Sequence, residues 1–399
     1  MEIRDFLKVM VERDASDIYL TVESPPMYRV NGVTQPIGDG KFANEQLEAL
    51  ANAVMKEKQR KEFEETLEMN LALAYDDLGR FRVNIFRQRG NVGLVIRQIK
   101  VEITPIDQLG LPSVIQDIAM TKRGLVLVVG ATGSGKSTTL AAMIDHRNTN
   151  APGHIMSVED PIEFVHRHKK SIVTQRELGF DTHSYTDALK NAMRQAPDVI
   201  LIGEIRDTET MDAAITFADT GHLCLGTLHS TNANQSFERM LNFFPETRHP
   251  QVLMQLSLNL RAIVSQRLIP SVDGKRVAAV EILMDTPRIK DLIKRGEIDT
   301  IKEAMEQGIQ EGCLTFDHSL FLLYKEGKIG LDQALIHADS TNNLRLKVKL
   351  EGLKGDEAID KLLEKDAREK DAREKEARGK PAGFQIQGVK PTGGQVRKI

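Results

Sequence analysis

One short stretch restricts the fold of this chain more than any other. Residues 130–137 read GATGSGKS and satisfy the pattern G-x-x-x-x-G-K-[ST], in which glycines let backbone N–H groups wrap a phosphate chain. LVLVV before the loop predicts a strand, and STTLAAMIDH after it predicts a helix whose N-terminus adds partial positive charge. Together they predict a nucleotide-binding α/β domain. The residues expected to contact the nucleotide are Gly130, Ala131, Thr132, Gly133, Ser134, Gly135, Lys136, Ser137 and Thr138.

Two side chains of this loop have defined tasks in the motif. Lys136 is expected to reach the β- and γ-phosphates of ATP, and the Ser137 hydroxyl is expected to ligate Mg²⁺. A second group directed at the metal follows at residues 198–204, DVILIGE, where an apolar strand ends in Glu204. Gly203 stands where many P-loop enzymes carry an aspartate. Glu204 is therefore expected to act on the metal alone or through a water.

A further acidic cluster occupies residues 156–163, MSVEDPIE, at the end of another predicted strand. It places Glu159, Asp160 and Glu163 within five residues, beside a proline. Carboxylates held this close repel one another unless a cation shares the space. One of them could orient or deprotonate an attacking water. The alternative is a solvated loop, and the pattern alone leaves both interpretations open.

Histidines flank the short apolar strand LCLG. His222 precedes this strand, and His229 follows it. A neutral imidazole at the end of a strand can sense a γ-phosphate or pass its loss to a neighbouring loop. Most isolated histidines of this kind are ordinary core or surface groups, so the pattern does not decide their role.

Arginines gather in the N-terminal region and beside the acidic stretches. A phosphoryl-transfer site often takes charge stabilisation from an arginine supplied by a neighbour. Arg82 and Arg97 belong to the N-terminal group, and Arg194 and Arg206 lie near the acidic stretches. For each of them the alternative is an exposed charge on a strand or helix. The N-terminal group as a whole consists of Arg80, Arg82, Arg87, Arg89 and Arg97.

The first hundred residues predict a separate α+β unit around an antiparallel sheet. Phe81, Val83 and Ile85 alternate with polar residues, as in a strand with one buried face. Asn44 is a plausible N-cap for a long helix. The helices are expected at 1–14 and 44–67, and the strands at 17–22, on both sides of Asn31-Gly32, at 79–90 and at 92–99.

The rest of the chain changes in character after a connector rich in proline and glycine at 101–118. Short apolar runs separated by helices then indicate a parallel sheet buried on both faces. After the strand HIMSVED we expect a loop and then a helix at 185–194, and we expect 249–354 to be mainly helical. The charged five-residue repeat at 365–379 and the segment after it predict a disordered tail, with a polybasic surface anchor as the alternative.

Composition excludes several classes of protein. Hydrophobic residues make up 41% of the chain, which is enough for ordinary cores, and the net charge of −3 disfavours a strongly basic nucleic-acid protein. Two cysteines, Cys224 and Cys313, exclude a zinc ribbon and a disulfide scaffold. The N-terminus carries acids and does not resemble a secretory signal. No stretch approaches the roughly 20 apolar residues that span a bilayer, so membrane association is expected only through partners or the surface.

The order of these segments resembles the nucleotide-site boxes of the secretion-superfamily ATPases. GATGSGKST, SVEDPIEF, DVILIGEIRD and TGHLCLGTLHS correspond to their Walker A, Asp box, atypical Walker B and His box. SPPMYRVNG, GRFRVNIFRQRG and AIVSQRLIP extend the resemblance to roughly residues 1–350. Within this superfamily the chain is similar to the type IV pilus retraction ATPases of the PilT/PilU group. RIKDLIKR at 288–295, SLFLLYKEGKI and the charged C-terminus favour the accessory, PilU-like branch.

This resemblance implies an α/β and α+β protein of two domains. A PAS-like domain at 1–100 and a linker at 101–118 would precede a RecA-like ATPase domain with a helical C-terminal part at 119–354 and a tail at 355–399. It implies a homo-hexamer in the cytoplasm, at the inner-membrane base of the pilus machine. Its implied partners are a companion retraction ATPase and an inner-membrane platform protein.

The resemblance also assigns roles to residues. Glu163 would be the catalytic base, Glu204 would assist Ser137 at the metal, and His222 and His229 would be sensors. The arginines implied as fingers are Arg82, Arg97, Arg194 and Arg206.

Three other functions remain open. Assembly ATPases are usually larger, with an extra N-terminal domain and often a zinc site with four cysteines, and this chain has neither feature. A hexameric nucleic-acid motor would need a basic pore with aromatic platforms, whereas 5% of these residues are aromatic, so no nucleic-acid partner is expected. A nucleotide-binding scaffold without activity would have no need to retain both Glu163 and Glu204.

Overall fold

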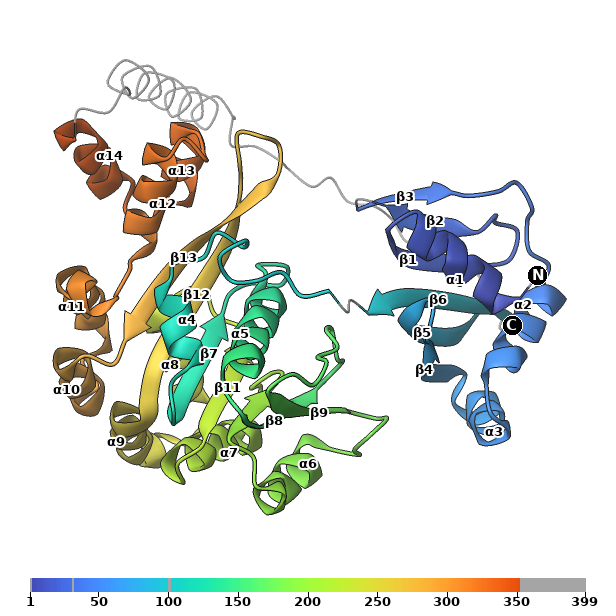
Figure 1. Cartoon of the computed structure of the whole chain (residues 1–399), viewed down its shortest axis with the longest axis horizontal. Coiled ribbons are helices and arrows are strands. Elements are labelled where there is room, and N and C mark those ends of the chain that lie inside the picture. Colours follow the sequence, from blue (N-terminus) through green and yellow to red (C-terminus); the bar gives the residue numbers. More distant parts are fainter. Residues whose placement is uncertain (1, 31, 100–101, 352–399) are drawn as a thin grey trace, which may run out of the picture.

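The computed structural model describes residues 2–30, 32–99 and 102–351, and Figure 1 shows their arrangement. The described residues form two sheets, one of six strands from the N-terminal region and one of seven strands from the rest. The N-terminal elements are α1 (Ile3–Glu12), β1 (Ala15–Leu20), β2 (Met27–Val30), β3 (Val33–Pro36), α2 (Asn44–Val54), α3 (Glu57–Thr66), β4 (Glu68–Tyr75), β5 (Gly79–Gln88) and β6 (Asn91–Ile99).

The N-terminal sheet is antiparallel throughout, as the sequence predicts. Its strand order is β3-β2-β1-β6-β5-β4, and it includes β4, a strand that is not among those expected from the sequence. Phe81, Val83 and Ile85 are completely buried on one face of β5. They pack in one core cluster with Leu7 of α1 and Leu47 of α2. The predicted period of two therefore places Arg80, Arg82 and Asn84, which alternate with them, on the opposite face of the sheet.

The helix expected at 44–67 is two helices, α2 and α3, separated at Met55 and Lys56. The predicted N-cap at Asn44 is also wrong, because the N-cap is Ala43 and Asn44 is the first helical residue. The Asn44 side chain instead accepts a hydrogen bond from the backbone N–H of Val92 at 2.9 Å. It ties the helix to β6, which is a tertiary contact that helical spacing does not reveal.

The second part of the chain builds the seven-stranded sheet and its helices. Its strands are β7 (Gly124–Val129), β8 (Gly153–Glu159), β9 (Ser171–Glu177), β10 (Val199–Ile202), β11 (Leu223–Leu228), β12 (Leu260–Pro270) and β13 (Arg276–Met284). Its helices are α4 (Val114–Ala119), α5 (Lys136–Asn150), α6 (Tyr185–Ala192), α7 (Thr208–Asp219), α8 (Ala233–Asn242), α9 (His249–Asn259), α10 (Pro287–Arg295), α11 (Ile301–Gln307), α12 (Phe316–Lys325), α13 (Leu331–His337) and α14 (Thr341–Leu350).

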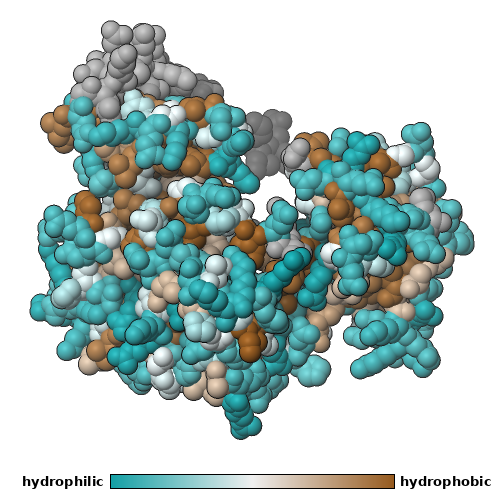
Figure 2. Space-filling view, in the orientation of Figure 1, coloured by the Kyte–Doolittle hydropathy of each residue, from teal (hydrophilic) through white to brown (hydrophobic). Residues whose placement is uncertain are grey.

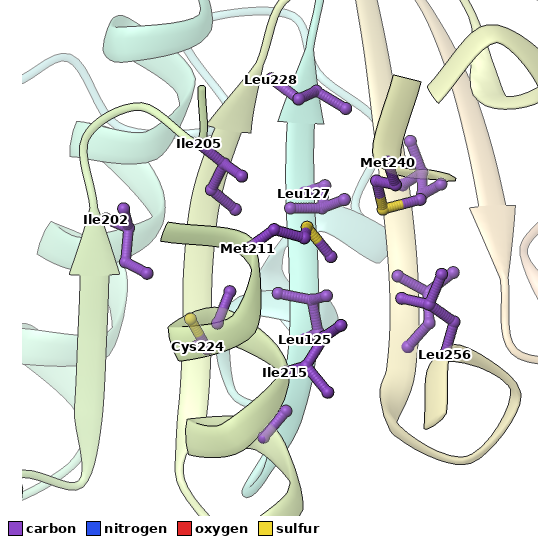
Figure 3. Packing of buried hydrophobic residues seen from close by; sticks show 14 of the residues in the cluster. Leu125, Leu127, Ile202, Ile205, Met211, Ile215, Cys224, Leu228, Met240 and Leu256 are labelled. Carbon is purple, nitrogen blue, oxygen red and sulfur yellow. The ribbon is translucent and has the colours of Figure 1, made fainter. Parts of the chain in front are cut away.

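The strand order is β13-β12-β7-β11-β10-β8-β9, and every neighbouring pair is parallel except β12 with β13. Both faces are buried, as predicted. On one side Leu125 and Leu127 of β7 join a core cluster with α7, and Figure 3 shows Met211 and Ile215 of α7 lying against them. On the other side Val126 packs with residues of α4 and α5. Parallel strands place their carboxyl ends on one edge, and this edge carries the candidate site.

One expectation about this part is incomplete and another is wrong. The described part of 249–354 is mainly helical, but after α9 the strands β12 and β13 interrupt the helices with an antiparallel hairpin that completes the sheet. The loop expected after β8 contains a further strand, β9, paired with β8. Strands buried on both faces lack alternation, so a run such as 262–264, which is completely buried, cannot be distinguished from a buried helix by its period.

The segment 101–118 contains regular structure where we expect only a connector. α4 begins within it, and Ile106, Leu111 and Ile115 are buried in the cluster that lies against β7. The predicted tail at 355–399 lies outside the described residues. Hydrophilic side chains cover most of the face in Figure 2. Among the described residues, none of the helices has the length and apolar character needed to cross a bilayer.

Candidate active site

The loop between β7 and α5 has the conformation that its glycines predict. Gly130 follows the last residue of β7 with φ of +155°, and a Cβ there would lie 2.6 Å from the carbonyl oxygen of Gln266. Gly135 has φ of +92° and would bring a Cβ within 2.7 Å of the Gln266 amide nitrogen. Both positions therefore require glycine. At Gly133, where φ is +78°, an added Cβ would meet nothing within 4 Å.

Lys136, the first residue of α5, lies over this loop. Its ammonium donates hydrogen bonds to the carbonyl oxygens of Gly130 at 2.8 Å and Ala131 at 3.0 Å. Burial lowers the pKa of Lys136, and the negative charges of Glu204 and Glu163 oppose that shift. Lys136 is thus held within the loop by two carbonyl oxygens, and the charges of both predicted catalytic carboxylates act on it.

A cavity of about 500 Å³ opens at the carboxyl edge of the sheet, directly above this loop. It is large enough for a small-molecule ligand. Gly130, Ala131 and Ser134 are not among its lining residues, and the Ser134 hydroxyl is buried with no partner among the described residues. The predicted site residues that line the cavity are Thr132, Gly133, Gly135, Lys136, Ser137, Thr138, Glu163, Glu204 and His229.

The acidic residues of the cavity differ in their surroundings. Glu163 is exposed and lines the cavity. Glu159 accepts hydrogen bonds from the Ser157 hydroxyl at 2.6 Å and the Gln175 amide at 3.1 Å. Burial raises the pKa of Glu159, and these two donors oppose the rise. Two donors thus occupy the Glu159 carboxylate, whereas Glu163 is exposed in the cavity wall.

Glu204 and His229 meet across the ends of β10 and β11. The Glu204 carboxylate lies 3.4 Å from His229 Nε2. The parallel register of the two strands brings these ends together, because Ile202 pairs with Gly226. The structure thus joins the predicted metal residue to the predicted sensor.

Arg206 lies next to one of the acidic residues that line the cavity. Its guanidinium lies 3.7 Å from the carboxylate of Asp160, which lines the cavity. The backbone N–H of Arg206 donates to the hydroxyl of Thr210 in the first turn of α7 at 3.2 Å.

The structure does not bring His222 or Arg194 to this cavity. His222 directly precedes β11, and its carbonyl accepts a hydrogen bond from Gly124 N at the beginning of β7. Arg194 lies in the 3-10 turn Met193–Gln195, which comes shortly before β10 begins at Val199. Since a strand rises about 3.3 Å per residue, the seven steps from His222 to His229 separate the two histidines by roughly 20 Å. In this chain, both residues lie at the edge of the sheet opposite to the cavity.

Arg82 and Arg97 lie side by side on the N-terminal sheet, where their positions pair between β5 and β6. Arg97 forms an ion pair with the buried Asp17 at 2.8 Å. Glu177, at the end of β9, accepts a hydrogen bond from the backbone N–H of Ile162. Burial raises the pKa of Glu177, while that hydrogen bond and the charges of Arg82 and Arg80 act against the rise. The charge of Arg82 therefore acts on Glu177, whose hydrogen bond to the backbone of Ile162 holds the acidic loop.

Sequence reasoning missed part of the cavity wall. The hairpin β12–β13 contributes Leu268 and Arg276. Gln266 of the same hairpin accepts a hydrogen bond from the hydroxyl of Thr139 in α5 at 2.7 Å, so it braces the helix that follows the loop. The segment AIVSQRLIP, which lies in β12, is one of the segments that carry the family resemblance. No residue pattern near the phosphate-binding loop, however, indicates that the hairpin folds back onto that loop. The other missed lining residues include Phe164, His166 and Thr227.

The residues present fit a hydrated Mg²⁺ ion. The Ser137 hydroxyl and the Glu204 carboxylate both line the cavity, and oxygen ligands of this kind suit Mg²⁺. Mg²⁺ normally keeps several waters and is bound by one or two protein ligands together with substrate phosphates. This donor set therefore suits an ion that arrives with a nucleotide.

Burial of His166 in the cavity wall predicts that the stability of the fold depends on pH. It is 9% exposed, and its Nδ1 has no partner among the described residues. Burial lowers the pKa of His166 from 6.5 to about 4. As the pH falls through this window, the unfolded chain takes up the proton first, so we expect the fold to lose up to about 3 kcal/mol.

The variant His166→Gln should lose less stability on acidification than the wild type. The measurement is the free energy of unfolding in urea at about pH 7 and about pH 4.5. Other titrating groups act equally in both proteins and cancel in the comparison. Equal losses in both proteins would show that His166 does not remain neutral in the fold.

Comparisons with known proteins agree with this geometry. Residues 2–320 match the family described as Type II/IV secretion system protein. The chain is 52% identical to the type IV pilus ATPase PilU of Pseudomonas aeruginosa over 351 residues, which cover 88% of this chain and 92% of PilU. It is 42% identical to the retraction ATPase PilT of the same organism over 334 residues, which cover 84% of this chain and 97% of PilT.

A solved structure shows the same arrangement of elements. The crystal structure of the pilus retraction motor PilT with bound ADP superposes with a TM-score of 0.81 at 40% identity, covering 86% of this chain and 99% of that one. The resemblance inferred from the sequence motifs is confirmed. The chain belongs to the type II/IV secretion system protein family, among the relatives of PilU and PilT.

Proposed function

We propose that this protein is an Mg²⁺-dependent ATPase that drives or assists the retraction of type IV pili, as an accessory retraction ATPase. The observation that carries the proposal is the convergence of Lys136, Glu163 and Glu204 on one cavity, in a chain 52% identical to PilU. The PilT structure with bound ADP supports a nucleotide in the corresponding place.

The residues of the cavity divide the chemistry among them. The loop N–H groups and Lys136 bind the phosphates and offset their charge. Ser137 and Glu204 would hold Mg²⁺, which supplies further charge neutralisation when bound. Glu163 accepts a proton from the attacking water, and the Glu204–His229 contact makes His229 responsive to changes at the phosphates.

In this proposal the remaining predicted residues act between domains or between neighbouring subunits of a ring-shaped assembly. In a homo-hexamer, Arg82 and Arg97 of the N-terminal sheet would approach the nucleotide when the N-terminal part moves toward the cavity. Arg194 and His222 lie at the opposite edge of their own sheet, so a role at a nucleotide would be at that of a neighbouring subunit. Hydrolysis would then remove a bridge between rigid bodies and let them rotate.

The proposed setting follows from the relatives. PilU and PilT are named as pilus ATPases, so a companion retraction ATPase and an inner-membrane platform protein are the proposed partners. We place the protein in the cytoplasm at the base of the pilus machine, in contact with the membrane only through those partners.

A specific observation favours retraction over assembly. The match to the assembly ATPase PilB of Myxococcus xanthus has 36% identity and covers 47% of this chain and 32% of PilB. The matches to PilU and PilT cover more than nine tenths of those proteins. The architecture of the chain is thus that of the retraction group.

Imaging of labelled pili in cells lacking this protein tests the direction of action. A retraction role predicts that pili still extend but retract less often than in the wild type. Cells without pili would instead indicate an assembly ATPase, and unchanged pilus dynamics would contradict both roles. Stimulation of the purified ATPase by single-stranded DNA would favour the nucleic-acid motor.

A further inference from the structure

Tyr185 is a buried aromatic residue beside the acidic cluster that no step of the proposed chemistry uses. It is the first residue of α6, it is 6% exposed and it belongs to the core cluster under α7. Its hydroxyl has no hydrogen-bond partner among the described residues. An unpaired buried hydroxyl contributes no stabilising interaction of its own, so the value of this side chain must lie in its ring.

The ring of Tyr185 lies next to the guanidinium of Arg206. The central carbon of the guanidinium is 5.3 Å from the centre of the ring, within the range of a cation–π interaction. The hydroxyl of Thr186 also donates a hydrogen bond to Glu209 in the first turn of α7. This hydrogen bond joins the beginnings of α6 and α7, and it thereby helps to keep the Tyr185 ring next to the Arg206 guanidinium.

Arg206 connects the Tyr185 ring to the acidic loop that contains Asp160. Its backbone is held by the start of α7, where the Asp207 side chain caps the helix by accepting from Thr210 N at 2.9 Å. Its side chain, however, is 48% exposed and reaches Asp160 at 3.7 Å. An exposed ion pair alone holds a long side chain weakly. A second contact, on the aromatic face, reduces the rotamers open to the arginine.

We propose that the ring of Tyr185 holds the Arg206 guanidinium toward Asp160, which makes Tyr185 a positioning residue for the loop that carries Glu163. Asp160 lies three residues before Glu163, and both line the cavity. A fixed Asp160 limits the movement of the Glu163 carboxylate relative to the phosphates. This inference rests on the proposed function, since it concerns the assigned base.

The proposed role uses the ring of Tyr185 and does not require its hydroxyl to ionise. Burial raises the pKa of this phenol, and the negative charge of Asp160 raises it further. The group therefore stays protonated at neutral pH. The charged groups that act on it are Asp160, Glu204, Glu159 and Arg206.

Two substitutions of Tyr185 separate ring from hydroxyl. Tyr185→Phe keeps the ring, and we expect its kcat for ATP to remain within about twofold of the wild type. Tyr185→Leu keeps a buried apolar side chain but removes the aromatic face, and we expect kcat to fall about 3- to 10-fold with little change in KM. An equal loss in both variants, or no loss in Tyr185→Leu, would overturn the proposal.

A double-mutant cycle with Arg206→Ala tests the path through the arginine. Once Arg206 is absent, Tyr185→Leu should cause no further loss of kcat, whereas independent effects would multiply and contradict the proposal. Thermal unfolding of each variant shows whether it is folded at the assay temperature. If Tyr185→Leu is not, Tyr185→Met enters the same cycle under the same criteria. Normal turnover in Lys136→Ala would instead contradict the proposed function. Failure of the Tyr185 proposal and failure of the proposed function can therefore be told apart.

Discussion

Replacing Lys136 with alanine is expected to lower ATP turnover by at least about 100-fold. Lys136 is the cation that lies within the phosphate-binding loop, 2.8 Å from the carbonyl of Gly130, and two cavity carboxylates act on its charge. Without it, the phosphates would face Glu163 and Glu204 with one compensating charge fewer. The measurement is steady-state phosphate release by the purified, full-length protein with Mg²⁺ and ATP.

Lys58→Ala provides the matched control for this experiment. Lys58 is exposed on α3 of the N-terminal part, and its substitution should leave turnover unchanged. Lys136→Arg keeps the charge but changes its shape and reach, so it should also be impaired. Turnover near the wild-type rate in Lys136→Ala would contradict the assignment of the cavity as the ATPase site.

The second large effect is expected at Glu163. Glu163→Gln preserves size and hydrogen bonding but cannot accept a proton, so kcat should fall by about 10²–10³-fold, within the usual range for a general base. Binding of ATP should persist, because Glu163 has no predicted contact with the phosphates. Single-turnover hydrolysis and fluorescence binding of a labelled ATP analogue measure the two properties separately.

The neighbouring acids make this prediction selective. Glu159→Gln should have a smaller effect, because two donors already occupy that carboxylate. Glu204→Gln should raise the Mg²⁺ concentration needed for half-maximal activity, which Glu163→Gln should not do. Glu306→Gln, on the exposed side of α11, is the surface control. The base is misassigned if Glu159→Gln loses more activity than Glu163→Gln.

Much of the candidate site was predictable because parallel strands deliver their carboxyl ends to one edge. The loop before Lys136 follows β7, Glu163 follows β8, Glu204 follows β10 and His229 follows β11. Each of these strands is a short apolar run that the sequence reveals directly. Strand order was not needed, because any order of neighbouring parallel strands brings these residues to the same edge.

The same reasoning shows why His222 and Arg194 fall elsewhere. Each residue precedes its strand, and the length of a strand alone separates it from the residues that follow. The resemblance supplied their roles as members of a site, but a site in a ring can be divided between subunits.

The hairpin β12–β13 could not be predicted from local pattern. The central residues of both strands are buried on both faces, and Gln266 and Leu268 reach the loop from more than a hundred residues away in the sequence. Gln266 is 4% exposed, and its value lies in contacts with Thr139 and Gly135 that exist only after folding. The N-terminal sheet was easier, because one of its faces is polar and the alternation along β5 is visible.

The most direct test is the retraction of labelled pili in cells that lack this protein and carry either the wild-type chain, Lys136→Ala or Glu163→Gln. The two variants should be produced at wild-type levels. If hydrolysis in this chain's own cavity contributes to retraction, the wild type restores the frequency of retraction events and neither variant does. Full restoration by both variants would contradict this account, because the chain would then assist retraction without its own ATP chemistry.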